Sequence, residues 1–490
     1  MKNFAKLAWT LAMVLAAVPG LGVAEQGSGG GESPASLMPD EQYVQEVLKG
    51  LGDYWEGVEE ARAEAPGAAE PIDLDVRRCV ELALAQNARV LVAQDEVDAA
   101  QALVGQAKSA RLPQVKVQEG YSYIQALEGS SGLGGVLGSL FSSGLLSDTK
   151  VRRDQFSLTQ VVYAGGQIQA AMRASEYLAQ SQEWQRQATL DGLEFEAKQA
   201  YYAVLLTRAL VRVAEESVVT FERHLSDAQQ ALDVGVISNF VVLRAKTELG
   251  ARKSDTVTVR DAERLALLNL RRVLALAQDT PIRLAAELAC EPLPGPPEEL
   301  IRLALEHRPE LLALRKGLGA AKEDIVRRKG SFKPRAAANA EWTNTDGGGT
   351  AAPDGWTFSI GAEWDLYVGG RRKHEVAEAK ARVRGLEHQI QDVERLIELD
   401  VRRSIIQIND AAAKIRSEQG NVELGREGLR LAELRFQEGV GTQAETLDAE
   451  LALTAAESSL VRALHDYAVA HASLKRATAQ SSIDRERPSP

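Results

Sequence analysis

The chain has 490 residues and a formal net charge of −12, and only 5% of its residues are aromatic. So few aromatic side chains exclude several large cores, and the acidic balance argues against a nucleic-acid partner, since phosphate binding needs a basic surface. Residues 114–280 and 354–487 contain no proline, which favours long uninterrupted helices over compact domains.

Residues 1–24 have the pattern of a secretory signal peptide. Lys2 and Lys6 precede an apolar run, and Gly22-Val23-Ala24 supplies the small residues of a cleavage site. The apolar run is short for a membrane span, no run of about 20 apolar residues follows it, and no cysteine follows the expected cut. The sequence therefore predicts an exported protein that no transmembrane helix holds. Residues 25–71 form an N-terminal extension or linker to which we assign no function.

From residue 72 onward the chain contains two copies of one pattern. Tyr163-Ala-Gly-Gly166 and Tyr367-Val-Gly-Gly370 are 204 residues apart (367 − 163), as are Gly235 and Gly439 (439 − 235). A period of about 200 residues is too long for a solenoid repeat and indicates two halves of one architecture. The resulting divisions are the first structural repeat at 72–291, the second at 292–480 and a C-terminal tail at 481–490.

Each copy contains a long stretch that favours helix, from Gly166 to Gly235 and from Gly370 to Gly439. At 1.5 Å per residue such a helix is about 100 Å long, so it has to pack on other long helices. After each tip glycine the chain returns as a second, antiparallel helix. Apolar residues recur at coiled-coil spacing. The positions are Val211, Ala214, Val218, Phe221, Leu225, Ala228 and Leu232 in the first copy, and Ile415, Val422, Leu429 and Phe436 in the second.

A change from helical to alternating spacing predicts one β-hairpin in each copy. A predicted helix, residues 79–108 or 300–328, ends before a strand-opening proline, Pro113 or Pro334. Apolar and polar residues then alternate, as in a strand with two different faces. The apolar positions are Val115, Val117, Tyr121 and Tyr123, then Ala336, Ala338, Ala340 and Trp342, then Trp356, Phe358, Ile360, Ala362, Trp364 and Leu366. A further strand is expected around residues 152–162, after a loop at 128–148.

Four amphipathic strands in an exported protein suggest a membrane barrel, with a soluble sandwich as the alternative. Four strands cannot close a barrel, and open edges are not tolerated in lipid. Two copies of the chain would give 8 strands and a filled interior, whereas three would give 12 and an open lumen. The polar face favours the open lumen. We therefore expect a mainly α fold with a small β part, in which antiparallel coiled-coil helices and two β-hairpins form a trimeric α-barrel and a 12-stranded transmembrane β-barrel.

The landmarks together resemble the outer-membrane efflux protein family (TolC-like) over residues 72–480. They are Leu82-Ala-Leu-Ala-Gln-Asn87, Leu303-Ala-Leu-Glu-His-Arg-Pro309, the two strand-opening prolines and the two Tyr-x-Gly-Gly sequences. The resemblance implies a homotrimer in outer-membrane lipid with a long periplasmic portion. It also implies a passive conduit from periplasm to exterior in tripartite efflux or type I secretion, with a periplasmic adaptor (membrane fusion) protein and an inner-membrane pump as partners. One departure is Ala88, where the family usually has proline.

The helix-to-helix turns are the predicted docking tips. They consist of Gly235, Val236, Ile237 and Ser238 in the first copy and Gly439, Val440, Gly441 and Thr442 in the second. Glycine permits the positive φ that such turns need. The resemblance implies that the adaptor docks on these tips at the periplasmic end, a role compatible with that of ordinary turns.

Glu445 and Asp448 lie one helical turn apart on one face of a predicted helix. Threefold symmetry would place six carboxylates around a lumen, where they would form a cation-favouring periplasmic constriction. The alternative is a solvated helix face. The family's entrance is often held shut by Tyr and Arg against Thr and Asp, but the aligned residues are Phe436 and Gly441 against Phe240 and Val241. Closure must therefore rest on packing or on other contacts.

The sequence predicts no enzyme, no cofactor and no metal site. Gly132-x-Gly134 lies in a predicted hairpin loop, and His307, His374 and His465 are expected on helix surfaces. Cys79 and Cys290 would form a disulfide or remain two buried thiols. The alternative classes are a periplasmic coiled-coil adaptor and a structural envelope protein. The first should contain a compact β-rich domain, and the second would not need paired hairpins with a Trp-bearing apolar face.

Overall fold

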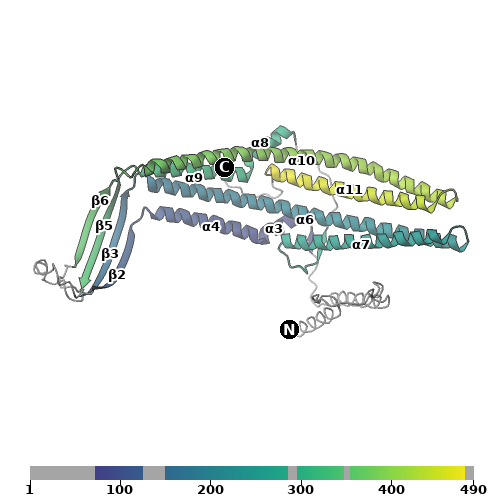
Figure 1. Ribbon diagram of the computed structural model, residues 1–490, viewed down its shortest axis with the longest axis horizontal. Coiled ribbons are helices and arrows are strands. Elements are labelled where there is room, and N and C mark those ends of the chain that lie inside the picture. The colour runs from purple at the N-terminus through teal and green to yellow at the C-terminus, as the bar shows by residue number, and fades with distance from the viewer. Residues whose placement is uncertain (1–71, 125–148, 285–294, 347–353, 481–490) are drawn as a thin grey trace, which may run out of the picture. The chain divides into compact units, whose positions relative to one another are not determined.

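Figure 1 shows the computed structural model, which describes residues 72–124, 149–284, 295–346 and 354–480. These ranges belong to one compact unit, Glu70–Pro490. The predicted signal peptide, the extension at 25–71, the loop at 128–148, Cys290 and the tail at 481–490 lie outside the described residues.

Both copies have the same order of elements. The first contains β1 (Ile72–Leu74), α3 (Val76–Gln86), α4 (Ala88–Ser109), β2 (Gln114–Ile124), β3 (Thr149–Tyr163), α6 (Gln167–Asp233) and α7 (Asn239–Val273). The second contains β4 (Ile282–Leu284), α8 (Pro297–His307), α9 (Pro309–Gly330), β5 (Arg335–Asp346), β6 (Gly355–Glu363), α10 (Arg371–Gln437) and α11 (Gln443–Ala477). β4 precedes the boundary expected at residue 292, but it holds the place in the second copy that β1 holds in the first.

The two long helices are confirmed. α6 and α10 contain 67 residues each, so each is about 100 Å long. Each begins after a glycine with positive φ, 89° at Gly166 and 81° at Gly370, because only glycine adopts this conformation without strain. α7 and α11, of 35 residues each, return antiparallel along them. Every predicted seam position from Val211 to Leu232 is buried or half-buried.

The helices at 79–108 and 300–328 were wrongly predicted as continuous. The first is broken at Asn87, whose backbone is extended and whose side-chain oxygen accepts a hydrogen bond from the Arg89 amide at 3.0 Å. Asparagine is a strong N-cap because its side chain satisfies an amide that the new helix leaves free. Arg308 makes the equivalent break, since the residue before Pro309 avoids helical backbone. The break therefore persists although Ala88 replaces the family's proline.

A short parallel pair of strands was not predicted. β1 pairs with β4 through Ile72↔Ile282 and Leu74↔Leu284, so the starts of the two copies lie side by side. Leu74 and Leu284 are buried in one core with Cys79 and Tyr201. Burial raises the pKa of the Cys79 thiol to about 12, so the thiol remains protonated near neutral pH.

The hairpins form one antiparallel sheet in the order β2-β3-β5-β6, with β2 and β6 at its edges. Rows across the sheet alternate in character. One row is Val117, Phe156, Trp342 and Trp356, and the next is Lys116, Ser157, Glu341 and Thr357. β6 ends at Glu363, so Trp364 and Leu366 lie just beyond the strand that was predicted to contain them.

The helices lie in two adjoining arrays. Near the sheet the neighbours follow the order α4, α6, α9, α10, and towards the turns they follow the order α7, α6, α11, α10 (Figure 1). The sheet lies beyond one end of the long helices, and the α6–α7 and α10–α11 turns lie at the other. Among the described residues, no helix combines the length and the apolar character that a membrane crossing requires.

Candidate functional site

Both tips are helix ends of the Schellman type. At the first, the Gly235 amide donates to the Leu232 carbonyl at 2.9 Å, and the Val236 amide donates to the Ala231 carbonyl at 2.9 Å. At the second, the amides of Gly439 and Val440 repeat this pattern, each at 3.0 Å. A positive φ of 77° at Gly235 and 74° at Gly439 makes the turn. The structure thus gives the two tips one backbone geometry.

The tips present apolar side chains to solvent. Val236 is 76% exposed and Val440 is 71% exposed, and Val234 and Phe240 beside the first tip are exposed to a similar extent. Exposed apolar residues that gather at one place mark a surface that binds another protein. The sequence analysis did not assign Val234 to the tip, because the helix pattern continues to that residue.

The second tip is the tighter of the two. The Gly441 amide also donates to the Arg435 carbonyl at 2.8 Å, and a Cβ added at Gly441 would lie 2.9 Å from the Arg435 Cβ. The first tip has Ile237 at this position. Thr442 then caps α11, because its hydroxyl oxygen accepts a hydrogen bond from the Glu445 amide at 3.3 Å.

Glu445 and Asp448 are both exposed on the first turns of α11. The Glu445 Oε2 atom lies 3.5 Å from Nε of Arg435, so this carboxylate is partly balanced within its own chain. Asp448 forms no ion pair within the part of the chain that the structure describes. The positive end of the helix dipole favours the carboxylate of Glu445, which lies in the first turn of α11. Asp448 therefore contributes more uncompensated negative charge than Glu445.

Polar and apolar contacts join the two helical hairpins near the turns. The Gln443 Nε2 atom of α11 donates to the His224 carbonyl of α6 at 3.2 Å. The Arg223 guanidinium of α6 pairs with Glu433 of α10 at 2.7 Å. Phe221, Leu249 and Leu447 form a small apolar cluster from α6, α7 and α11. These contacts could not be predicted from the sequence, because the partners lie about 200 residues apart and share no sequence pattern.

Two titratable groups are buried at this junction. Glu450 and His224 are each 5% exposed, and Nε2 of His224 has no hydrogen-bond partner among the described residues. Burial, and then the nearby Glu457 and Glu433, raises the pKa of Glu450 to about 7, although Arg223 opposes this shift. Burial, followed by Arg223, lowers the pKa of His224. Glu450 of α11 and His224 of α6 therefore both favour their uncharged forms where the two helical hairpins pack together.

Comparison with known proteins identifies the architecture. The model of a family described as "Outer membrane efflux protein" matches residues 79–276 and 300–480, which are the bodies of the two copies. The chain belongs to the outer membrane efflux protein family. The match covers the long helices, the sheet and the turns together, so it sets aside the periplasmic adaptor and the structural envelope protein.

Curated relatives include proteins of efflux and of secretion. The chain is 24% identical over 341 residues to the outer membrane efflux protein BepC of Brucella suis, covering 67% of this chain and 72% of that protein. It is 25% identical over 322 residues to the alkaline protease secretion protein AprF of Pseudomonas aeruginosa, covering 64% and 65%. The fold is also similar to a solved structure of CusC, with a TM-score of 0.71, 18% identity and coverage of 83% and 92%.

The family membership fixes the class of function. The protein is an outer-membrane channel of efflux and type I secretion systems, and its long helices form the periplasmic portion. The turns lie at the end of the long helices that is away from the sheet. All ten predicted site residues belong to the turns or to the first turns of α11.

Replacing Glu450 by Gln should stabilise the protein at alkaline pH. The folded state disfavours the ionised carboxylate of Glu450. The wild-type protein therefore loses stability as the pH rises from the ordinary pKa of 4.5 to the folded-state pKa of about 7. Glutamine has a similar shape and no charge. We expect the variant to be about 3 kcal/mol more stable than the wild type at pH 8 and equal to it near pH 4. Thermal unfolding in detergent at both pH values measures this difference.

The matched control is Glu423→Gln, which removes an exposed carboxylate of α10. It should not change the dependence of stability on pH. Equal unfolding temperatures for wild type and Glu450→Gln at pH 8 would show that burial of this carboxyl group costs nothing.

Proposed function

We propose that three copies of this chain assemble into one closed channel, a passive conduit from the periplasm to the exterior. The observation that carries the proposal is that the sheet and both helix arrays have two uncovered edges each. The sheet ends in β2 and β6, the helices near the sheet end in α4 and α10, and the helices near the turns end in α7 and α10. One neighbour on each side would cover all of them.

The strand directions permit this closure. Neighbouring strands are antiparallel throughout, so β2 and β6 of one chain run in opposite directions. β6 of one copy can therefore pair with β2 of the next in the same antiparallel sense. Three copies of four strands give 12, an even number that encloses an open lumen. Pairing would also satisfy the edge amides and carbonyls, which lipid cannot do.

The two faces of the sheet suit lipid on one side and water on the other. The apolar rows present Trp342, Trp356 and Phe358, and the rings of Trp356 and Phe358 stack with centroids 5.9 Å apart. The opposite rows carry Lys116 and Glu341 beside Ser and Thr residues. Water in the lumen would solvate these charges, whereas hydrocarbon would not.

α10 carries a second apolar stripe that is exposed in the part of the chain that the structure describes. The exposed residues Leu396, Leu399, Ile406, Leu424, Leu431 and Leu434 fit a 3-4 spacing. α7 carries a similar stripe, with Phe240, Leu243, Val257 and Leu268 exposed. Heptad stripes pack on other heptad stripes, and α7 and α10 lie at opposite sides of one array. These stripes would pair between copies around the ring.

Charges on the α10 stripe should break the trimer. Leu399→Asp with Ile406→Asp would bury unpaired carboxylates between copies, whereas each leucine-sized side chain normally contributes about 1.5–3 kcal/mol by burial. We expect the variant to lose its trimeric mass in detergent, as measured by native mass spectrometry. Leu399→Met with Ile406→Met keeps the stripe apolar and should remain trimeric. A wild-type protein that is a monomer in detergent-free buffer would contradict the assembly.

The tips would dock a periplasmic adaptor through its helical hairpins. Val236 and Val440 stand exposed on rigid turns, and the apolar residues Val234 and Phe240 extend the first tip. A rigid apolar knob loses little entropy on binding, which suits it to dock against a partner helix. The adaptor in turn would connect the channel to an inner-membrane pump.

Aspartates at the tips should abolish export that depends on the adaptor. Val236→Asp with Val440→Asp places charge at the docking surface while the Schellman turns keep their glycines. We expect trimers to reach the outer membrane in normal amount but export to fall to background. Val236→Leu with Val440→Leu preserves the apolar knobs and should retain export. Unimpaired export by the aspartate variant would exclude docking at these residues.

Glu445 and Asp448 would form the acidic constriction of the periplasmic entrance. Six exposed carboxylates around a threefold axis would attract cations and repel anions. The nearby Arg435 weakens the contribution of Glu445 but leaves that of Asp448 intact. Asp448 would therefore set most of the selectivity.

Single-channel conductance tests the constriction. Glu445→Ala with Asp448→Ala should lower the preference for cations over anions, because all six carboxylates are removed. Asp448→Asn alone should lower it more than Glu445→Gln alone. Unchanged cation selectivity in the double variant would assign both residues to an ordinary solvated helix face.

A further inference from the structure

Basic residues gather where the sheet meets the helices. The chain as a whole is acidic, with a net charge of −12. By contrast, residues 327–335 contain five Lys and Arg residues, residues 371–373 contain three, and neither segment contains an acidic residue. These segments are the end of α9, the start of β5 and the start of α10. The segments that connect the sheet to α9 and α10 are therefore basic, in contrast to the acidic chain as a whole.

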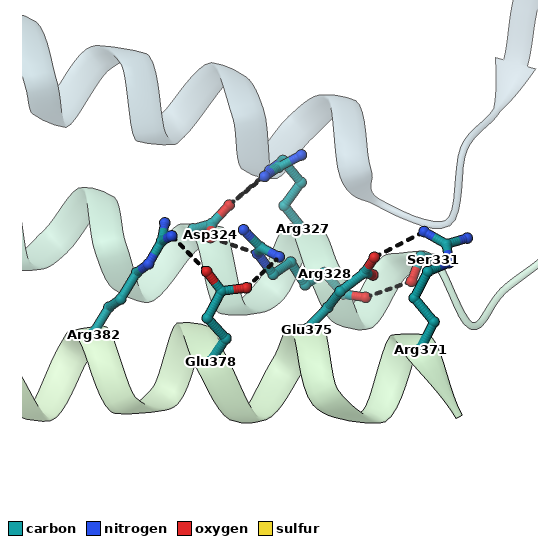
Figure 2. Close-up of polar contacts among 8 residues, drawn as sticks. All are labelled: Asp324, Arg327, Arg328, Ser331, Arg371, Glu375, Glu378 and Arg382. Carbon is teal, nitrogen blue, oxygen red and sulfur yellow. Dashed lines mark hydrogen bonds and ion pairs between the residues drawn. The ribbon is translucent and has the colours of Figure 1, made fainter. Parts of the chain in front are cut away.

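The arginines of this region are held by acidic partners (Figure 2). Arg327 and Arg328 pair with Asp324 at 2.6 and 2.9 Å, and Arg328 also reaches Glu378 at 3.4 Å. Arg371 pairs with Glu375 at 2.8 Å. The Arg328–Glu378 pair joins the end of α9 to the start of α10, and the other pairs lie within one helix. The arginines therefore contribute little free charge.

Three lysines remain exposed without an ion pair to any described residue. They are Lys329, Lys333 and Lys373, which we call the lysine trio. Lys329 and Lys333 flank the junction of α9 and β5, and Lys373 lies in the first turn of α10. An unpaired ammonium on a flexible stem can reach a phosphate outside the protein.

Exposed aromatic residues occupy the same level. Trp364 is 58% exposed and Tyr367 is 85% exposed. The Trp364 Nε1 atom donates to the Phe332 carbonyl at 3.0 Å, and the Arg372 guanidinium lies over the Phe332 ring at 6.0 Å. Trp364 directly follows β6, which ends at Glu363. Its indole is held at the end of the sheet by the hydrogen bond to Phe332.

We propose that the lysine trio, with Trp364 and Tyr367, binds the headgroups of anionic phospholipids in the periplasmic leaflet of the outer membrane. Tryptophan and tyrosine favour the headgroup level of a bilayer, and lysines beside them pair with lipid phosphates. The opposite end of the apolar face has a mixed network instead, in which Arg152 pairs with Glu119 at 3.1 Å and Asp154 at 3.2 Å. The inference rests on the proposed barrel, because the apolar face must meet lipid.

Native mass spectrometry of the full-length protein tests this site. Trimers are exchanged into nanodiscs of phosphatidylethanolamine and phosphatidylglycerol, released, and scored for the lipid that remains bound. Wild type should retain phosphatidylglycerol in preference to phosphatidylethanolamine. Lys329→Gln, Lys333→Gln and Lys373→Gln together should abolish the preference, since each lysine near a lipid surface contributes about fivefold in affinity.

A matched control removes three other exposed cations, by Arg212→Gln, Lys246→Gln and Arg416→Gln on the periplasmic helices. It changes the net charge equally and should keep the preference. Trimer mass and channel conductance of the same samples report on the barrel separately. An intact conducting trimer without a preference for phosphatidylglycerol in the wild type would overturn the site. Loss of the preference in the control, or retention of it in the lysine variant, would overturn it as well.

Discussion

The constraint on which this structure depends is the unsatisfied backbone at the two edges of its sheet. β2 and β6 each have a row of amides and carbonyls that no strand of the described residues pairs. In water such an edge is tolerable, but in hydrocarbon each unpaired group costs several kcal/mol. The helices also require neighbours, but through the hydrophobic effect. Exposure of the apolar stripes of α7 and α10 to water is unfavourable, and packing against another chain would bury them. The same neighbouring chains could therefore satisfy both the edges of the sheet and the apolar stripes of the helices.

The duplication explains how one chain meets both demands. β3 of the first copy pairs with β5 of the second, and α6 of the first copy packs against α9 of the second near the sheet and against α11 of the second near the turns. The internal seam between copies thus resembles in outline the proposed seam between chains. The polar contacts at the internal seam, such as Gln443 with the His224 carbonyl, give it a specificity that apolar stripes alone lack.

The sequence predicted the parts of the fold that leave a local signal. Positive-φ glycines at residues 166, 235, 370 and 439 and the heptad residues between them defined the long helices, because turn and seam each require particular residue types. Alternation defined the strands. The break at Asn87 was missed because one asparagine does not interrupt the helical spacing of the apolar residues around it. Its capping hydrogen bond to the Arg89 amide is seen only in the structure. The exposed tips followed from the same glycines, whereas Glu450 and His224 look like ordinary helix residues in sequence.

The parallel pairing of β1 with β4 has a consequence for biogenesis. Ile72 cannot meet Ile282 until more than two hundred residues between them have crossed the inner membrane. Closing so large a loop is slow, so a newly exported polypeptide exposes the apolar side of its first half while synthesis continues. Periplasmic chaperones that shield nascent chains would have their greatest effect during this interval. A chain that ended before residue 282 would lack the strand that completes this core.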